Sequence, residues 1–285
     1  MSRLRNALSA PGAAAVAPFA LLLLVFGLVA LLAPWLAPLD PNKQSLLARL
    51  RPPGTTAGAA MFWLGTDELG RDLLSRTIHG ARASLVVALL SVTVSGAVGI
   101  ALGVLAGYLR GWVEIAIMRA VDIMLSIPAI LLAIITVAVL GPGLLNLVLV
   151  LGFTRWPRYT RVAYAQTLGQ ANLPYIAASR LAGARTPRLL LRHLLPNIAA
   201  PLVVVATLEF GLMILFEAGL SFLGLGIQPP MPSWGSIMSV GRSYVGTAWW
   251  IATFPGICLF MLVLSVNICG DFLRDRFDPR SSIRG

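Results

Sequence analysis

The sequence predicts an all-α membrane protein whose chain crosses the bilayer six times. Of its 285 residues, 58% are hydrophobic and 12% are charged, and the mean hydropathy is +0.84. The apolar residues form uncharged blocks close to the roughly 20 residues that a helix needs to cross a bilayer core. Arginines border these blocks, as expected where positive charge marks the cytoplasmic side of membrane spans. This composition excludes a soluble globular domain.

The net charge of +11 does not indicate a nucleic-acid-binding protein. Such a protein presents a basic face on a soluble fold or a basic run with aromatic residues, whereas the only lysine here is Lys43. Lys43 does not lie in a Gly-Lys-Ser/Thr phosphate loop, and no HExxH or CxxC spacing occurs. We therefore expect no enzymatic activity of this chain and no cofactor or metal ion bound by it.

The first two spans follow from uncharged blocks. Residues 13–33 are long enough to cross the bilayer, and we expect a retained helix, because the apolar core of a secretory signal is shorter, about 7–15 residues. Residues 83–109 lie between Arg82 and Arg110 and form the second predicted span. Small residues at three- or four-residue spacing allow helices to approach closely in lipid, and the glycines of this span follow that spacing at 96, 99, 103 and 107.

The third and fourth spans are less regular. Residues 113–140 form the third, with Pro128 as a kink, and it ends at the Gly-Pro-Gly turn of residues 141–143. The fourth has only residues 144–154 before three arginines, at 155, 158 and 161. A lipid-facing helix does not easily hold these charges. We expect this helix to face a protein partner or an aqueous path, or to let its arginines reach the inner headgroups, and to extend into the cytoplasm.

Residues 198–220 and 249–270 form the fifth and sixth predicted spans. The loop between them is rich in glycine and proline and too short for a further span. Irregular backbone at membrane level usually lines a cavity, so the loop is interpreted as an outer gate, with an ordinary surface loop as the alternative. Its gate candidates are Phe222 and Trp234, although Trp234 also suits an interfacial aromatic belt.

Seven arginines and no acidic residue fall within residues 155–197, which predicts that this segment is cytoplasmic. Alternation then places both termini inside. It places three loops outside the membrane, residues 37–82, 141–146 and 221–248. The first of these contains six basic residues, but long loops count little under the positive-inside rule.

The cytoplasmic segment contains two short predicted helices. Pro174 and Pro187 suit first-turn positions, Thr186 suits the cap of the second helix, and Gly183 is placed to end the first helix in a left-handed conformation. Small residues around this turn would let another surface approach, and nearby arginines could bind carboxylates or lipid phosphates. The alternative is an amphipathic segment lying on the headgroups of membrane lipids. The candidate docking residues are Ala177, Ala178, Ser179, Arg180, Gly183, Ala184 and Arg185.

Two carboxylates lie within the fifth span. Glu209 falls near its middle and Glu217 near its outer end, about 12 Å apart along a helix, so both could view one cavity. Together with Pro128, they complete the candidates for a translocation path. In one hypothesis Glu209 helps conduct a cationic or zwitterionic substrate; in the other it forms a structural pair with an arginine or backbone donors of a neighbouring helix. The helical spacing of Arg119 and Asp122 predicts a structural salt bridge.

The cytoplasmic segment resembles the "EAA" loop of binding-protein-dependent ABC importer permeases. Residues 177–179 (Ala-Ala-Ser) stand at its triplet, Gly183 at its glycine and residues 195–196 (Leu-Pro) at its end, while the glutamate of the triplet is missing. Five further stretches resemble the second permease subunit of dipeptide, oligopeptide and nickel importers. They are "LGTDELGRDLLSRTIHGARASL", "DIMLSIP", "VLGPGLLN", "EAGLSFLGLGIQPPMPSWG" and "GDFLRDRFDPR", and they extend from about residue 64 to residue 280.

This resemblance implies a type I ABC importer permease of MetI-like fold in the bacterial plasma membrane. Residues 1–82 would hold the N-terminal tail, first helix and outer segment, residues 83–273 the permease domain with a coupling loop at about 169–197, and residues 274–285 a cytoplasmic tail. The implied partners are a second, homologous permease subunit, two cytoplasmic ATPases that carry ATP and Mg, and an extracytoplasmic binding protein that delivers a peptide. Nickel complexes and glutathione are alternative cargoes.

A self-sufficient secondary transporter is the alternative from another class of protein. It would be expected to show an internal repeat and its own ion site near the middle of the membrane. The sequence shows neither feature.

Overall fold

The computed structural model describes residues 13–57 and 60–277, which form helices, one short hairpin and connecting loops. The chain divides into two compact units. Unit 1 contains residues 1–89, 137–148 and 210–269, and unit 2 contains residues 90–136, 149–209 and 270–285. Helices α4 (Leu73–Leu109) and α10 (Leu195–Phe222) contribute residues to both units.

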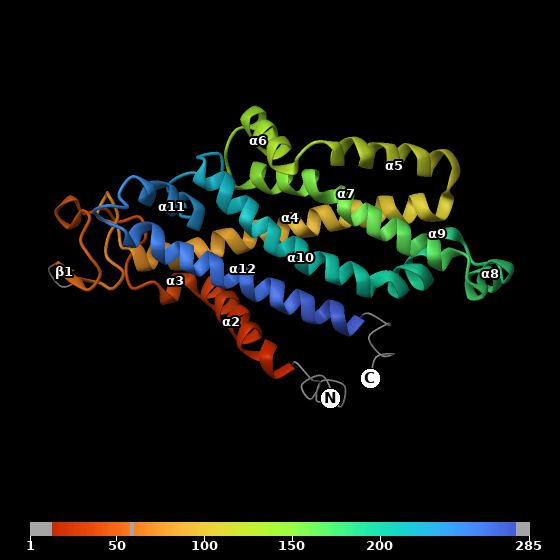
Figure 1. Ribbon diagram of the computed structural model, residues 1–285, viewed down its shortest axis with the longest axis horizontal. Helices are drawn as coiled ribbons and strands as arrows, with labels where there is room; N and C mark the ends of the chain where they lie inside the picture. The colour runs from red at the N-terminus through yellow and green to blue at the C-terminus, as the bar shows by residue number, and fades with distance from the viewer. Residues whose placement is uncertain (1–12, 58–59, 278–285) are drawn as a thin grey trace. The chain divides into compact units, whose positions relative to one another are not determined.

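Unit 1 contains the N-terminal helices, the segment of residues 37–72 that precedes α4 and most of the C-terminal helix (Figure 1). Besides parts of α4 and α10, the end of α6 (Ala129–Leu140) and the start of α7 (Leu144–Ala171), its elements are α2 (Ala13–Leu31), α3 (Ala33–Leu36), the 3-10 turn η1 (Leu46–Ala48), β1 (Thr55–Ala57), β2 (Ala60–Phe62), α11 (Trp234–Arg242) and most of α12 (Trp250–Phe277). Strands β1 and β2 pair antiparallel, with Thr55 opposite Phe62. The sequence predicted only a loop over this segment.

Helix α4 begins ten residues before the predicted span. Asp72 lies just before it, and its carboxylate accepts a hydrogen bond from the backbone N–H of Ser75 at 2.8 Å, as a helix cap does. The predicted span covers only the uncharged block and so leaves out the charged first turns of α4. These turns find polar partners in residues 37–72, where the backbone N–H of Leu39 donates to the Ser75 hydroxyl and Arg76 donates to the carbonyl of Pro41.

The core of unit 1 joins the start of α4 to α11 and α12. Leu73, Ile237, Ala248, Trp250 and Ile251 are buried together. The indole N–H of Trp250 donates to the carbonyl of Thr66 at 3.1 Å. The segment of residues 37–72 is therefore fixed to the rest of unit 1 by both apolar packing and a buried hydrogen bond.

Unit 2 contains the middle of the chain. Its elements, besides parts of α4 and α10, are α5 (Gly111–Ser126), the first part of α6 (Ala129–Leu140), most of α7 (Leu144–Ala171), α8 (Pro174–Leu181), α9 (Thr186–Arg188) and the π-helical turn η2 (Leu189–Leu194). A buried apolar cluster of Val104, Ala163, Leu194, Ile198 and Leu202 connects α4, α7, η2 and α10.

The glycines of α4 produce the predicted close helix contact. A methyl group on Gly99 would lie 2.6 Å from Tyr159 Cβ, and one on Gly103 would lie 2.7 Å from Ala163 Cβ. Both neighbours belong to α7. Because real Cβ atoms essentially never approach this closely, a side chain at either position would force α4 and α7 apart.

The third predicted span is broken rather than gently kinked. Helix α5 ends at Ser126, α6 begins at Ala129, and the two axes differ by 90° (Figure 1). Ile127, the residue before Pro128, is extended, with φ −100° and ψ 130°. Proline disfavours the helical conformation of its preceding residue, which explains why the break falls here. The predicted position of the irregularity is thus confirmed, and its size was underestimated.

Within residues 13–57 and 60–277, four helices are long and apolar enough to cross a membrane, or five if the bent α5–α6 pair is one span. The four are α2, α4, the continuous helix from Thr186 to Phe222, and α12. Helix α7 is continuous over 28 residues, as predicted for a helix that extends beyond its apolar stretch, but the arginines within it exclude it from this count. A total of six spans remains a prediction.

Candidate functional site

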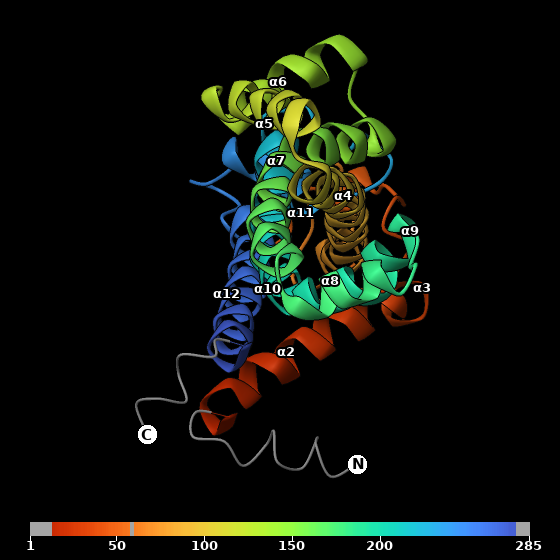
Figure 2. The ribbon, with the colours of Figure 1, turned by 90° about the vertical axis from the view of Figure 1, so that its right-hand side faces the viewer.

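The segment after α7 folds as helix, turn and helix, as its sequence predicts. Helix α8 has Pro174 in its first turn, and α9 has Pro187 in its first turn. Between them Gly183 adopts φ +82°, a left-handed conformation that glycine enters without a steric cost. Figures 1 and 2 both show α8 and α9 beside each other across this turn. The prediction that Thr186 caps this helix is wrong. Thr186 is the first residue of the helix, and the N-cap is Arg185, which makes no side-chain capping hydrogen bond.

The second short helix does not end before α10. Residues 186–222 form one continuous helix, in which η2 supplies a π-helical turn between α9 and α10. A displacement of the α8–α9 turn would therefore act directly on α10. Leu189 and Leu194 are buried within this connection, which anchors it to unit 2.

Helix α8 is fixed to unit 2 through buried and aromatic contacts. Ile176 is fully buried, and the Tyr175 hydroxyl accepts a hydrogen bond from Asn197 Nδ2 at 3.1 Å. Arg180 Nε donates to the Tyr108 hydroxyl at 3.2 Å, and its guanidinium lies 4.7 Å from the centre of the Tyr108 ring. The sequence analysis predicted that Arg180 would be available to a partner. In the structure its guanidinium instead contacts Tyr108 in the last turn of α4.

The other six docking candidates have no contact of this kind with α4 among the contacts of the described residues. Four of them are exposed and two are half-buried; the exposed ones are Ala177, Ala178, Gly183 and Arg185, and the half-buried ones are Ser179 and Ala184. A methyl group on Gly183 would meet no atom within 4 Å. The segment thus presents a small-residue surface and an exposed basic side chain to whatever lies next to it.

A buried charge cluster joins α7 to α10 within unit 2. Arg155 Nε donates to Glu209 Oε2 at 2.8 Å, and Arg158 Nη1 donates to Glu209 Oε1 at 3.3 Å. The side chains of Arg155 and Glu209 are only 7% and 2% exposed, whereas that of Arg158 is 55% exposed. This arrangement is the structural pair with a neighbouring helix that was one of the two hypotheses for Glu209.

Two further polar contacts hold α5 against α7. Asp122 pairs with Arg161 at 2.7 Å, and the Tyr164 hydroxyl donates to Glu114. The predicted salt bridge between Arg119 and Asp122 is therefore wrong. Helical spacing made Arg119 the nearest candidate in sequence, but an arginine on an adjacent helix reaches the same carboxylate.

Glu217 lies in a different setting, within unit 1. Its side chain is fully buried, and Oε1 accepts a hydrogen bond from the Ser221 hydroxyl at 2.8 Å. The Ser221 hydroxyl also accepts from the backbone N–H of Ile227 at 3.3 Å. Glu217 thus helps position the loop that follows α10 rather than standing open to solvent.

The predicted gate residues take structural positions in unit 1. Trp234 is 1% exposed, and its indole N–H donates to the carbonyl of Thr77 at 2.9 Å, so it does not belong to an interfacial belt. Ser233 caps α11 reciprocally with Ser236. The Phe222 ring lies 5.2 Å from the guanidinium of Arg242.

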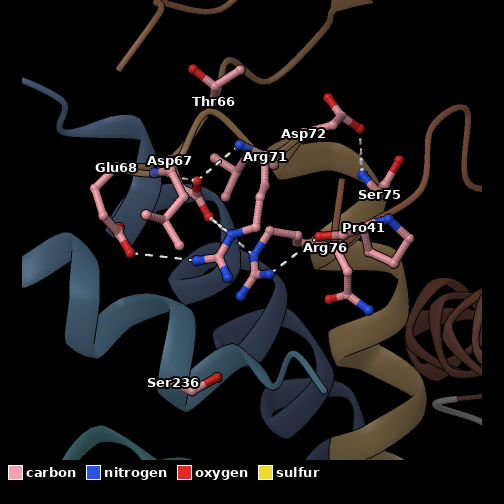
Figure 3. A network of polar contacts seen from close by, with 12 residues as sticks. Pro41, Thr66, Asp67, Glu68, Arg71, Asp72, Ser75, Arg76 and Ser236 are labelled. Atoms are coloured by element: carbon pink, nitrogen blue, oxygen red, sulfur yellow. Dashed lines mark hydrogen bonds and ion pairs between the residues drawn. The ribbon is translucent and has the colours of Figure 1, made fainter. Parts of the chain in front are cut away.

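The segment of residues 37–72 and the first turn of α4 share a compact ionic network that the sequence did not predict (Figure 3). Asp67 Oδ2 lies 2.6 Å from Arg71 Nε and 3.4 Å from Arg76 Nε, and Arg71 also reaches Glu68 at 3.4 Å. Partial burial, reinforced by the negative charge of Asp67, raises the pKa of the Glu68 carboxyl above its ordinary value. The signal in the sequence is the dense run of charges in "TDELGRDLLSR", which a purely solvated loop would not need.

Helices suited to a membrane, a buried charge cluster on two of the helices and a helix–turn–helix segment together define a multi-pass helical membrane protein. The chain belongs to the family described as binding-protein-dependent transport system inner membrane component, which matches residues 99–283. The resemblance found in the sequence is thereby confirmed.

Named relatives and solved structures are similar to most of this chain. It is 50% identical over 261 residues to the di/tripeptide transport system permease protein DppC of Pseudomonas aeruginosa (strain UCBPP-PA14), covering 91% of this chain and 86% of the relative. It is 46% identical over 253 residues to the dipeptide transport system permease protein DppC of Escherichia coli (strain K12), covering 88% and 84%. The chain is also similar in structure to a chain of the MetNI methionine ABC transporter in an inward-facing conformation, with a TM-score of 0.58 and 21% sequence identity. The match covers 72% of this chain and 98% of the transporter chain, and it supports the MetI-like fold.

Proposed function

We propose that this chain is the permease subunit through which an ATP-driven importer carries di- and tripeptides across a bacterial inner membrane. The observation that carries the proposal is the 50% identity, over 91% of the chain, to a protein named as a di/tripeptide permease. The relatives are named as permeases, so the hydrolysis of ATP belongs to separate subunits. A second permease and an extracytoplasmic binding protein complete the proposed assembly.

In this proposal α8 docks on a cytoplasmic ATPase. The exposed Ala177, Ala178 and Arg185 provide a contact surface, and Gly183 sets the angle of the turn. Because the helix continues from Thr186 to Phe222, a movement of the ATPase would be transmitted along α10. The permease would then alternate between inward-facing and outward-facing states, biased by nucleotide binding.

The test is ATP-driven uptake of a labelled dipeptide into proteoliposomes that contain this chain, its partner permease, the ATPases and the binding protein. Uptake that needs ATP and all subunits supports the proposal. Uptake driven by an ion gradient with this chain alone would replace it with a secondary transporter. Preference for a nickel complex or glutathione over dipeptides would overturn the cargo but keep the importer.

A variant of Gly183 tests the docking segment. Gly183→Val places a β-branched residue at φ +82°, a left-handed backbone conformation that costs such a residue roughly 1–2 kcal/mol of conformational free energy. The added Cβ would not clash, because no atom lies within 4 Å of it. We expect ATP hydrolysis without matching uptake. Gly169→Val is the matched control, because Gly169 also has open space around it but lies in regular helix. Equal uptake by the two variants would count against coupling through this turn.

A further inference from the structure

Helix α7 exposes few side chains over its unit 2 residues. From residue 149 to residue 164 nearly every side chain is buried or half-buried, and the exposed positions are Leu149, Phe153, Arg158 and Arg161. Leu149 and Phe153 are four residues apart and share one face of the helix. Arg158 and Arg161 are three residues apart and share a different face, because the five residues from Phe153 to Arg158 turn the helix by about 140°. The first face is apolar and the second is basic.

The basic face of Arg158 and Arg161 does not suit lipid tails. A charged side chain at membrane depth is costly unless it faces a protein interior or a water-filled space. Arg158 and Arg161 are each more than half exposed within this chain, at 55% and 53%. In the assembled permease this face is therefore expected to meet water or another polar surface.

The two exposed arginines differ in how far their charge is balanced. Arg161 has its own carboxylate, Asp122, at 2.7 Å. Arg158 shares Glu209 with Arg155, which is buried and holds the carboxylate at the shorter distance of 2.8 Å against 3.3 Å. Arg158 thus holds the more distant share of a carboxylate that a buried guanidinium also contacts, and its own guanidinium remains open to solvent.

We propose that Arg158 binds an anionic oxygen group, and specifically the C-terminal carboxylate of a peptide during its passage through the permease. The inference rests on the proposed function. A guanidinium binds a carboxylate through two parallel N–H donors, and Arg158 uses Nη1 alone for its long contact with Glu209. Arg158 is thus a specificity-determining residue, while Arg155 and Glu209 position it.

The same chemistry could come from a lipid phosphate, so the experiment separates the two sources. Uptake efficiency is measured for a dipeptide and for its C-terminal amide, in vesicles of neutral lipid and in vesicles that contain anionic lipid. The wild type is expected to favour the free acid. In Arg158→Gln this preference should fall by about tenfold, the size of one charge-assisted hydrogen bond, in both kinds of vesicle. Arg158→Lys should keep part of it.

Arg161→Gln is the matched control and should keep the wild-type preference, because Arg161 is already balanced by Asp122. The binding protein is the same in every assay, so its own selectivity cancels in the comparison. An unchanged acid-to-amide ratio in Arg158→Gln would overturn the inference, and a defect seen only with anionic lipid would assign Arg158 to a phosphate instead. If the wild type transports no peptide, the proposed function fails and the inference fails with it.

Discussion

At the scale of single residues, the buried carboxylate of Glu209 is the strongest electrostatic constraint in unit 2. It lies between Arg155 and Arg158 and is almost inaccessible to solvent. Removing one partner of a buried ion pair leaves the other charge without compensation, which costs far more than the pair itself contributes. An exposed pair such as Asp122–Arg161 contributes little, because solvent screens both charges.

We therefore expect Glu209→Gln to destabilise the protein by about 3–5 kcal/mol, against about 1 kcal/mol or less for Asp122→Asn. Thermal unfolding in detergent, followed by circular dichroism, measures both variants. A charge-neutralising amide of the same size is used at both positions, so only burial and the number of arginine partners differ. Equal shifts in the two variants would contradict the structural role given to Glu209.

The sequence could predict that Glu209 needs a partner, since an ionisable residue within an apolar helix is costly when alone. It could not predict which partner. Arg155 lies 54 residues away, and only the packing of α7 on α10 selects it. For Asp122 the sequence did suggest a partner, because Arg119 lies at helical spacing from it. In the structure Asp122 pairs instead with Arg161 of the neighbouring helix α7.

At the scale of elements, the contact between α4 and α7 depends on glycine. The sequence predicts that some helix approaches closely here, because the repeat of small residues is visible along one helix, but it does not name α7 as that helix. It does not predict the early start of α4, because the polar groups of the first turns have partners that are distant in the chain, such as Leu39 for Ser75 and Pro41 for Arg76. Thr66 in the loop before α4, for example, is held by Trp250 from α12.

Gly103→Ala is expected to destabilise the protein by about 1–3 kcal/mol, because its methyl group would lie 2.7 Å from Ala163 Cβ and no flexible side-chain end can move aside. Gly169→Ala should be neutral or stabilise by up to about 1 kcal/mol, since nothing lies within 4 Å of a methyl group there and alanine favours a helix. Chemical denaturation of the detergent-solubilised variants distinguishes the two. A cost at Gly169 as large as that at Gly103 would refute the packing argument.

The contact of Arg180 with Tyr108 connects α8 to the last turn of α4. If this contact transmits movement, Tyr108→Leu should lower the amount of peptide taken up per ATP hydrolysed by a few-fold. This fold-change corresponds to the loss of an exposed cation–π contact, which contributes about 0.5–1 kcal/mol. Tyr108→Phe keeps the ring and loses only the hydroxyl bond, so its effect should be smaller. Uptake and hydrolysis are measured in the same proteoliposomes. Identical ratios in wild type and Tyr108→Leu would show that the contact is only structural.

At the scale of the whole molecule, the sequence predicts the fold class and the protein family well, because the features that indicate them are spread along most of the chain. Long apolar blocks and bordering arginines indicate a multi-pass helical membrane protein, and motifs spread over more than two hundred residues indicate the permease family. The number of spans is harder to predict. It depends on α7, whose arginines look unsuited to a membrane until Glu209 and Asp122 are seen to balance two of them.

The distribution of arginine predicts the orientation of the chain in the membrane, with residues 155–197 on the cytoplasmic side and residues 37–82 outside. In a background of Cys258→Ser and Cys269→Ser, single cysteines are introduced at the exposed Thr56 of β1 and the exposed Ala177 of α8. A membrane-impermeant maleimide applied to intact cells should label the first and not the second, and permeabilisation should add labelling of the second. A cysteine at the fully buried Val121 serves as a control for accessibility and should stay unlabelled throughout. Labelling of Ala177→Cys in intact cells would place α8 outside, where no ATPase could reach it, and would overturn the proposed coupling together with the orientation.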